Sequence, residues 1–406
     1  MNATPCTLLI TLTGRDRPGV TSRLFAGLAA FPITVLDVEQ VVLRGRLVLG
    51  VLISCAETDA ADVTPSVTAI AAELGLEAEV TAGTGDNAPR RRGRLHVTVL
   101  GDPLLPAQVA AITGRLAAEG GNIDRIQRLS RRPVTAIEFD VSGADPVGLR
   151  AALTSEAAAQ QLDVAVQRGG LHRRAKRLVV MDVDSTLIQG EVIELLAEHA
   201  GCADEIARVT EATMRGELDF TESLRRRVAA LAGLDASVLH DVRDRLPLSP
   251  GARTLVRTLK RLDYRFAIVS GGFTQVTDEL VRMLGIDYSA ANTLEIVDGK
   301  ITGRLIGPIV DRAGKAAALE RFAGEAGVPI SQTVAIGDGA NDLDMITTAG
   351  LGIAFNAKPV LREAADTSVS VPDMDAVLYL LGISRDEVEA ADAEDMERAS
   401  LAVGRA

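Results

Sequence analysis

The sequence of 406 residues has no tryptophan, only 3% aromatic residues and three cysteines. Cys6, Cys55 and Cys202 are odd in number and show no metal-ligand spacing. This usage fits a reducing compartment, in which the cysteines fill space as small, buried side chains.

Long apolar runs and an excess of positive charge are also missing. No stretch approaches the roughly 18 unbroken apolar residues of a membrane-spanning helix. Asn2 and Thr4 introduce polar breaks that a secretory signal would not have. The net charge is −12, whereas a general nucleic-acid surface needs clustered Lys and Arg. We therefore expect a cytoplasmic protein with no nucleic-acid and no membrane partner.

The chain is long enough for two or three domains, and its 47% hydrophobic content is ample for their cores. Residues 6–82 read as strand, helix, two strands joined like a hairpin, helix and short strand. This order, βαββαβ, is that of a ferredoxin-like α+β unit. The same order recurs over residues 95–167, after a linker rich in glycine and arginine, which indicates a duplication.

A run of β-forming residues, 178–181, ends in Asp182 and Asp184. Side chains alternate along a strand, so the two aspartates start out pointing the same way. Open α/β sheets bind ligands at the carboxyl ends of their strands, where two carboxylates suit a hard cation and a phosphoryl group. Taken alone, the pair is equally compatible with a turn that an aspartate caps.

Three more polar clusters follow in the second half of the chain. Ser270-Gly271-Gly272 ends a predicted strand, Lys315 begins a helix, and a third strand leads into residues 337–342, Gly-Asp-Gly-Ala-Asn-Asp. A block of short helices, about 190–248, separates the first strand from these clusters. In this order the motifs resemble the haloacid dehalogenase (HAD) superfamily of aspartyl-phosphate hydrolases over residues 178–375. The resemblance implies an α/β, Rossmann-like core with a helical cap.

The chemistry of these residue types agrees with that resemblance. Phosphoryl transfer needs positioning and charge neutralisation, and a carboxylate can form an acyl phosphate that water later opens. The resemblance implies Asp182 as nucleophile and Asp184 as general acid and base. It implies Mg²⁺ as cofactor, with Asp182, Asp184 (through its backbone carbonyl) and Asp338 as ligands. The groups expected to hold phosphate are Ser270, Gly271, Lys315 and Asn341. Asp342 is expected to orient Lys315 or the water ligands of the metal; the alternative is that it only caps a helix.

The helical block narrows the resemblance to the phosphoserine phosphatases, whose pattern Glu191, residues 214–220 and residues 223–228 match. This implies that Glu191 pairs with the ammonium of the substrate and that Arg227 binds its carboxylate with two hydrogen bonds. Met214 and Phe220 would form an apolar wall. Outside this context, three consecutive arginines, 225–227, would more often be an exposed helix face.

The first ferredoxin-like unit resembles an ACT domain, because the turn Gly-Arg-Asp-Arg-Pro-Gly (14–19) lies between its first strand and helix. The resemblance implies an amino-acid effector such as L-serine, with Asp16 and Gly19 as regulatory residues, and a homodimer formed through ACT domains. The second unit has Gly-Asp-Pro-Leu-Leu-Pro (101–106) there, which leaves its ligand binding open. A dimerisation or spacer role is the alternative for both units.

We expect ACT-like domains at 1–85 and 93–169, a HAD phosphatase domain at 177–383 and an acidic tail at 384–406, a frayed and solvated helix. The predicted function is Mg²⁺-dependent hydrolysis of L-O-phosphoserine to L-serine and phosphate, the last step of serine biosynthesis. The alternatives are a phosphatase for another small phosphomonoester, a phosphotransferase to a second alcohol, and an amino-acid-sensing regulatory protein.

Overall fold

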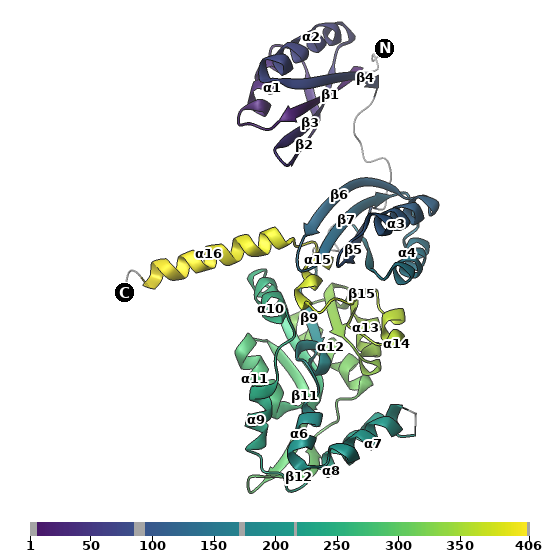
Figure 1. Ribbon diagram of the computed structural model, residues 1–406, viewed down its shortest axis with the longest axis vertical. Coiled ribbons are helices and arrows are strands. Elements are labelled where there is room, and N and C mark those ends of the chain that lie inside the picture. The colour runs from purple at the N-terminus through teal and green to yellow at the C-terminus, as the bar shows by residue number, and fades with distance from the viewer. Residues whose placement is uncertain (1–5, 85–93, 170–174, 215–216, 404–406) are drawn as a thin grey trace. The chain divides into compact units, whose positions relative to one another are not determined.

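A computed structural model describes residues 6–84, 94–169, 175–214 and 217–403, without the side chains of Met214, Asp244 and residues 399–403 (Figure 1). The contacts within the chain divide it into two units, residues 1–92 and 93–406, and each is described by itself. None of the described helices is both long enough and apolar enough to cross a lipid bilayer.

The first unit is an antiparallel four-stranded sheet, in the order β2-β3-β1-β4, with two helices. Alternate residues of β1, namely Leu8, Ile10 and Leu12, are buried in a core shared with α1 and α2, as the alternation in the sequence predicts. The predicted βαββαβ order is confirmed. Its elements are β1 (Cys6–Arg15), α1 (Val20–Leu28), β2 (Thr34–Leu43), β3 (Arg46–Cys55), α2 (Glu57–Leu74) and β4 (Leu76–Thr84).

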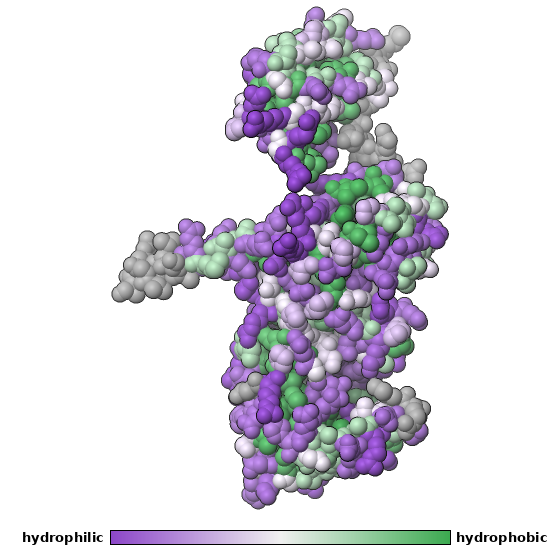
Figure 2. Space-filling view, viewed as in Figure 1, coloured by the Kyte–Doolittle hydropathy of each residue, from purple (hydrophilic) through white to green (hydrophobic). Residues whose placement is uncertain are grey.

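Strand β2 is an edge of this sheet, and almost all of its residues are exposed. The exposed side chains include several large apolar ones, among them Val38, Val41 and Leu43. Figure 2 shows apolar patches between the polar residues on the visible face of this unit. Because an edge strand presents unpaired backbone groups, such an apolar edge favours pairing with another strand.

The second unit begins with another βαββαβ sheet, in the order β6-β7-β5-β8. One face packs on its own two helices. Residues of the other face, Leu100, Leu129, Ala136 and Ala165, belong to the hydrophobic core of the large domain that follows. The elements are β5 (Leu95–Gly101), α3 (Pro106–Ala118), β6 (Asn122–Ser130), β7 (Thr135–Ser142), α4 (Pro146–Gln160) and β8 (Asp163–Arg168).

Asp163, at the start of β8, joins this sheet to the large domain. Its buried carboxylate accepts hydrogen bonds from the Ser370 backbone N–H at 2.6 Å and from the hydroxyls of Ser368 and Ser370, both at 2.9 Å. Burial raises the pKa of Asp163, and these three hydrogen bonds oppose the rise. Arg150 adds an ion pair to Asp366 at 2.5 Å. The seam between the two domains is therefore polar at its edge and apolar within.

The large domain is a seven-stranded sheet in the order β12-β11-β10-β9-β13-β14-β15, with β9 in the centre and only β12 antiparallel to its neighbour. The Rossmann-like fold is thus confirmed. Its elements are β9 (Leu178–Asp182), α10 (Ala252–Arg261), β10 (Arg265–Phe273), α11 (Thr274–Leu284), β11 (Tyr288–Val297), β12 (Lys300–Ile306), α12 (Arg312–Ala326), β13 (Thr333–Gly337), α13 (Leu343–Thr348), β14 (Gly352–Phe355), α14 (Pro359–Ala364), β15 (Thr367–Val369) and α15 (Val377–Leu380).

Four helices inserted between β9 and α10 form the cap: α6 (Val192–Ala200), α7 (Ala203–Met214), α8 (Phe220–Ala229) and α9 (Val238–Arg245). The chain enters and leaves the cap through two neighbouring segments. The Gln189 N–H donates to the Pro247 carbonyl at 2.9 Å, and the Ser249 N–H donates to the Leu187 carbonyl at 2.9 Å. These paired segments connect cap and core, and the cap also bonds to the edge strand β12, where the Ile301 N–H donates to the Leu234 carbonyl at 2.9 Å.

Strand β11 begins at Tyr288, because residues 288–292 pair in parallel with β10 before the strand continues into its antiparallel pairing with β12. One expectation about this domain was incomplete. The acidic tail is a helix, α16 (Arg385–Val403), but its first half is not frayed. Asp392 pairs with Arg257 at 2.5 Å and with Arg261 at 2.7 Å, and Val388 is buried.

Candidate active site

The candidate site forms where β9 ends at the edge of the sheet. All five residues of β9 are buried, and the Asp182 carboxylate accepts a hydrogen bond from the Val183 N–H at 2.7 Å. The next residues make a tight turn, residues 183–187, in which Ser185 has a φ of 56°. Thr186 in this turn donates to Asp338 Oδ1 at 3.1 Å. This bond ties the end of β9 to the end of the neighbouring β13.

Lys315, from the first turns of α12, is fully buried between two carboxylates. Its Nζ lies 2.7 Å from Asp182 Oδ1 and 2.7 Å from Asp342 Oδ1. Burial alone would lower the pKa of Lys315, but the two carboxylates raise it above its usual value. The other oxygen of Asp342 accepts the backbone N–H groups of Asp338 and Gly339, at 3.2 and 3.1 Å. Asp342 therefore orients Lys315 and shapes the loop after β13.

Carboxylate oxygens of Asp182, Asp338 and Asp342 lie within 4.8 Å of one another. Burial and the neighbouring Asp342 carboxylate raise the pKa of Asp338 to about 6. Burial and Asp342 also raise the pKa of Asp182, and Lys315 opposes this. Three carboxylates face one ammonium, so a divalent cation would neutralise the remaining charge, and hard oxygen donors fit such an ion.

Asp184 lies at the junction of core and cap. Its Oδ1 accepts the Val192 N–H of α6 at 2.9 Å, and its Oδ2 accepts the Ser270 hydroxyl at 3.0 Å. Burial raises the pKa of Asp184, and both hydrogen bonds oppose the rise. A side chain on Gly272 would place its Cβ 2.8 Å from Asp184 Oδ2, so a glycine is needed where β10 ends.

A pocket of about 690 Å³ lies between this sheet edge and the cap. Eight of the residues expected from the sequence line it: Asp182, Asp184, Glu191, Phe220, Arg227, Gly271, Asp338 and Asn341. Ser270, Lys315 and Asp342 do not line it but are buried next to residues that do. The side chain of Met214 lies outside the described residues. Asp16 and Gly19 belong to the other unit, where Asp16 is exposed and Gly19, with a φ of 96°, precedes α1.

Helix α8 turns only one of its three arginines into the pocket. Arg225 and Arg226 are exposed, and Arg226 pairs with Glu222 at 2.8 Å. Burial lowers the pKa of Arg227, and Glu191 opposes this. Burial, followed by the nearby Asp184, raises the pKa of Glu191. Arg227 Nε is buried and has no hydrogen-bond partner within the described residues. The pocket thus holds a cation and an anion on its cap side.

Six further residues line the pocket that the sequence motifs did not indicate: Ile193, Thr210, Thr213, Phe273, Arg312 and Lys358. Thr210 and Thr213 lie one turn apart on α7. Arg312 precedes Lys315 by one turn of α12, so helical spacing from a motif residue was a signal for it. Lys358 follows the end of β14, so its place after a parallel strand was the signal there.

Comparisons with known proteins agree with this geometry. Residues 179–347 match the family model of haloacid dehalogenase-like hydrolases, and residues 6–81 and 95–167 match two ACT-domain models. The phosphoserine phosphatase of Streptomyces coelicolor is 63% identical over 95% of this chain and 94% of its own. The phosphoserine phosphatase SerB2 of Mycobacterium tuberculosis is 55% identical over 96% of both chains. A crystal structure of a probable phosphoserine phosphatase from Vibrio cholerae, 36% identical, covers 73% of this chain and 88% of its own, with a TM-score of 0.58.

The fold and the site define a HAD-like hydrolase with two N-terminal ACT domains. Within that class, the extent of the match to the curated relatives shows that the chain belongs to the phosphoserine phosphatase family.

The raised pKa of Asp338 predicts a pH-dependent stability of the metal-free protein. The folded carboxyl has a pKa of about 6 against an ordinary value of 3.8, so the folded state holds a proton that the unfolded state has lost between these pH values. Stability therefore falls as pH rises through this window. Asp338→Asn, which keeps an acceptor for Thr186, should be more stable than the native chain at pH 7.5 by about 1–3 kcal/mol, and equally stable near pH 4.

Urea unfolding in the presence of a chelator measures this difference. Asp278→Asn is the control, because Asp278 is exposed on α11 and its replacement should change the stability little at either pH. An Asp338→Asn chain that is no more stable than the native one at pH 7.5 would contradict the prediction.

Proposed function

We propose that the chain hydrolyses L-O-phosphoserine to L-serine and phosphate in this pocket, with Mg²⁺ as the metal. The observation that carries the proposal is the pairing of two charge patterns in one pocket. Buried carboxylates and Lys315 surround the core side, and Glu191 and Arg227 face the cap side. The first pattern suits a phosphoryl group, and the second suits an amino acid with one ammonium and one carboxylate.

The substrate would enter with its phosphate toward the ends of β9 and β13 and its amino-acid part toward the cap. Arg227 has an Nε without a partner among the described residues, which a carboxylate oxygen would satisfy. Glu191 would accept the ammonium. Phe220 lies close to Gly271, whose Cβ, if present, would lie 3.1 Å from its ring. This contact narrows the pocket and limits the access of water around the seryl oxygen.

Asp182 would act as nucleophile. The Val183 N–H and Lys315 both bind its Oδ1, so its orientation is set and Oδ2 remains to attack phosphorus. The attack forms a carboxylate–phosphorus bond and breaks the bond to the seryl oxygen. Asp184, whose pKa burial raises, would hold the proton that this oxygen needs as it leaves. The first half-reaction thus releases L-serine.

In the second half-reaction, Asp184 would take a proton from a water molecule that attacks the phosphorus of the aspartyl phosphate. The bond to Asp182 breaks, phosphate leaves, and both carboxyl groups return to their starting state. Mg²⁺ held by Asp182, Asp338 and the Asp184 carbonyl would supply charge neutralisation at the phosphoryl oxygens. Asn341, the backbone N–H of Gly271 and the ammonium of Lys315 would hold the phosphate by hydrogen bonds and charge, and the Ser270 hydroxyl would support them.

Asp182→Asn should reduce kcat by about 10⁴-fold or more, because an amide is not a competent nucleophile toward phosphorus. The fold should remain, since Lys315 keeps its contact with Asp342. Phosphate release from L-phosphoserine with Mg²⁺ measures the change, and circular dichroism checks the fold. Residual turnover within tenfold of the native chain would remove Asp182 from the nucleophilic role.

Arg227→Ala should reduce kcat/KM for L-phosphoserine by about 30- to 300-fold, the cost of losing a charge-assisted pair in a partly buried site. For p-nitrophenyl phosphate, which has no carboxylate, the loss should be less than about threefold.

The matched control is Arg226→Ala, which removes a neighbouring arginine that is exposed and paired with Glu222. It should leave both substrates within about twofold of the native chain. If Arg227→Ala lowers the rate on both substrates equally, the carboxylate assignment is wrong.

For the N-terminal part, we propose that an amino acid such as L-serine binds near Asp16 and Gly19 and changes the phosphatase rate. We also propose a cytoplasmic homodimer through ACT domains, which the exposed apolar edge of β2 supports.

The proposed domain boundaries are 1–85, 93–169, 177–383 and 384–406. Phosphate release with and without L-serine, and sedimentation velocity of the full chain, test the effector and the dimer.

A further inference from the structure

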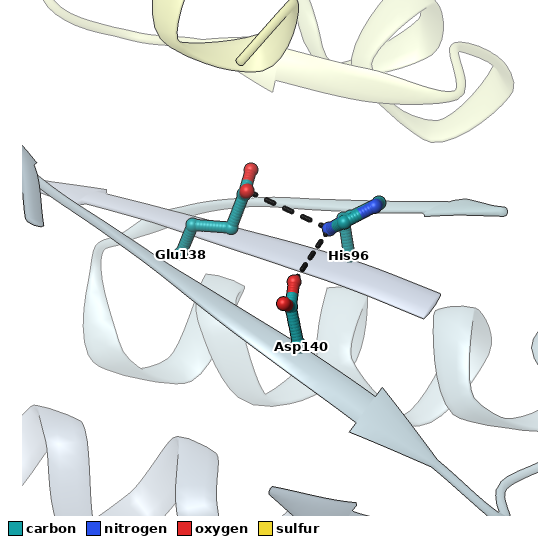
Figure 3. Close-up of side chains that lie close together, drawn as sticks. All are labelled: His96, Glu138 and Asp140. Atoms are coloured by element: carbon teal, nitrogen blue, oxygen red, sulfur yellow. Dashed lines mark ion pairs between the residues drawn. The ribbon is translucent and has the colours of Figure 1, made fainter. Parts of the chain in front are cut away.

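Outside the active site, one other group of side chains in the described part of the chain converges as metal ligands do. His96 lies on β5, and Glu138 and Asp140 lie on the neighbouring β7, in the second ACT domain. His96 is directly opposite Asp140 in the antiparallel register, and Glu138 is opposite Thr98. Because side chains alternate along a strand, all three project from the same face of the sheet. Figure 3 shows them pointing toward one another from the two strands.

The distances suit a shared ion. His96 Nδ1 lies 2.7 Å from Asp140 Oδ1 and 3.5 Å from Glu138 Oε1, and the three residues offer donor atoms that lie within 4.8 Å of one another. Two ligands bound about 2.1 Å from one ion at right angles are about 3 Å apart. Small side-chain adjustments would therefore place the three atoms around one cation.

A simple ion pair does not explain this arrangement. A protonated imidazole between two carboxylates would donate its Nδ1–H along one of the two contacts. Instead, His96 Nδ1 is buried and has no hydrogen-bond partner among the described residues, although Asp140 Oδ1 is only 2.7 Å away. Asp140 Oδ1 is thus close to His96 Nδ1 but lies off the axis along which Nδ1 would donate a proton. Two ligand atoms of a metal site lie close together in the same way, because both point toward the ion.

Neighbouring residues orient the three side chains, which remain partly exposed to solvent. Thr98 Oγ1 donates to Glu138 Oε2 at 3.3 Å, and Glu138 Oε1 is the oxygen that lies 3.5 Å from His96 Nδ1. The side chains of His96 and Asp140 are each 21% exposed, and that of Glu138 is 10% exposed. An ion could therefore enter from solvent and complete its coordination with water.

The group formed by His96, Glu138 and Asp140 lies close to the contact between the second ACT domain and the catalytic domain. Further along the same face of the sheet, Leu100 and Ala136 join the core of the catalytic domain. On β8, Gln167 lies opposite His96 and donates to the Leu380 carbonyl at 2.7 Å. The three side chains thus lie at the edge of the seam between the second ACT domain and the catalytic domain.

We propose that His96, Glu138 and Asp140 bind a divalent transition-metal ion of the Zn²⁺ or Mn²⁺ type. One imidazole nitrogen with two carboxylates favours such an ion over Mg²⁺, which prefers oxygen ligands alone. The site is separate from the catalytic acid cluster and differs from it in ligand type. Its ion stabilises the seam and takes no part in phosphoryl transfer.

Equilibrium dialysis of the metal-stripped full chain against micromolar Zn²⁺, with Mg²⁺ in large excess, followed by elemental analysis, tests the proposal. The native chain should retain one zinc ion more than His96→Gln and Asp140→Asn, whose affinity for that ion should fall at least tenfold. His240→Gln is the matched control, because His240 is an exposed histidine of the cap, and it should bind zinc as the native chain does. Equal zinc binding by all four chains overturns the proposal.

Two further measurements separate a ligand role from a general defect. With Mg²⁺ alone, phosphate release and the melting temperature of His96→Gln should match those of the native chain, and only the native chain should gain melting temperature when Zn²⁺ is added. If His96→Gln does not fold, Asp140→Asn carries the same comparison. Anomalous scattering at the zinc edge should place an ion about 2.0–2.2 Å from His96 Nδ1. Zinc found only among Asp182, Asp338 and Asp342 contradicts the proposal.

Discussion

The ammonium of Lys315, buried between Asp182 and Asp342, is the interaction on which the site depends. A charged lysine in a protein interior is tolerated only when its charge is paired and its hydrogen bonds are made. Here the two carboxylates come from the ends of different segments of the sheet. The pairing therefore holds β9, α12 and the loop after β13 at one point. Loss of one partner leaves the charge of Lys315 less compensated and also removes a group of the site, so the same contacts serve stability and chemistry.

A second constraint comes from the cap, which adds charged groups of its own to the pocket. The core side presents carboxylates together with Arg312 and Lys358, and Arg227 adds a cation from α8. Its neighbours Arg225 and Arg226 project away because successive residues of a helix point in different directions. The cap is joined to the core by the paired segments at residues 187–189 and 247–249, and also by backbone hydrogen bonds to the edge strand β12, where the Gly233 N–H donates to the Ile301 carbonyl at 2.8 Å. Recognition and chemistry are thus built on separate elements.

The second ACT domain is attached to the catalytic domain by a seam that combines apolar and polar contacts. Leu100 and Ala136 extend the core of the catalytic domain, and Asp163 binds the residues around β15. β15 is followed along the sheet by β14, whose end leads to Lys358 in the pocket. A conformational change at the seam would therefore reach the active site through only two neighbouring strands, β15 and β14. The proposed metal ion at His96 lies at the edge of the same seam.

The sequence alone determined the order of the elements and the set of residues that carry the chemistry. Strand alternation and helical period are local properties, and parallel strands bring their carboxyl ends to one edge of a sheet. Asp182, Asp184 and Asp338 could therefore be grouped from the sequence, and all three line the pocket.

Only the tertiary structure decided which side chains meet. It turned the Ser270 hydroxyl toward Asp184, bound Asp342 to Lys315, and packed the acidic tail against α10. It also placed His96 beside Asp140. These outcomes depend on strand register, on burial and on contacts between distant segments, because a short stretch of sequence does not specify the partner that a side chain meets across the fold.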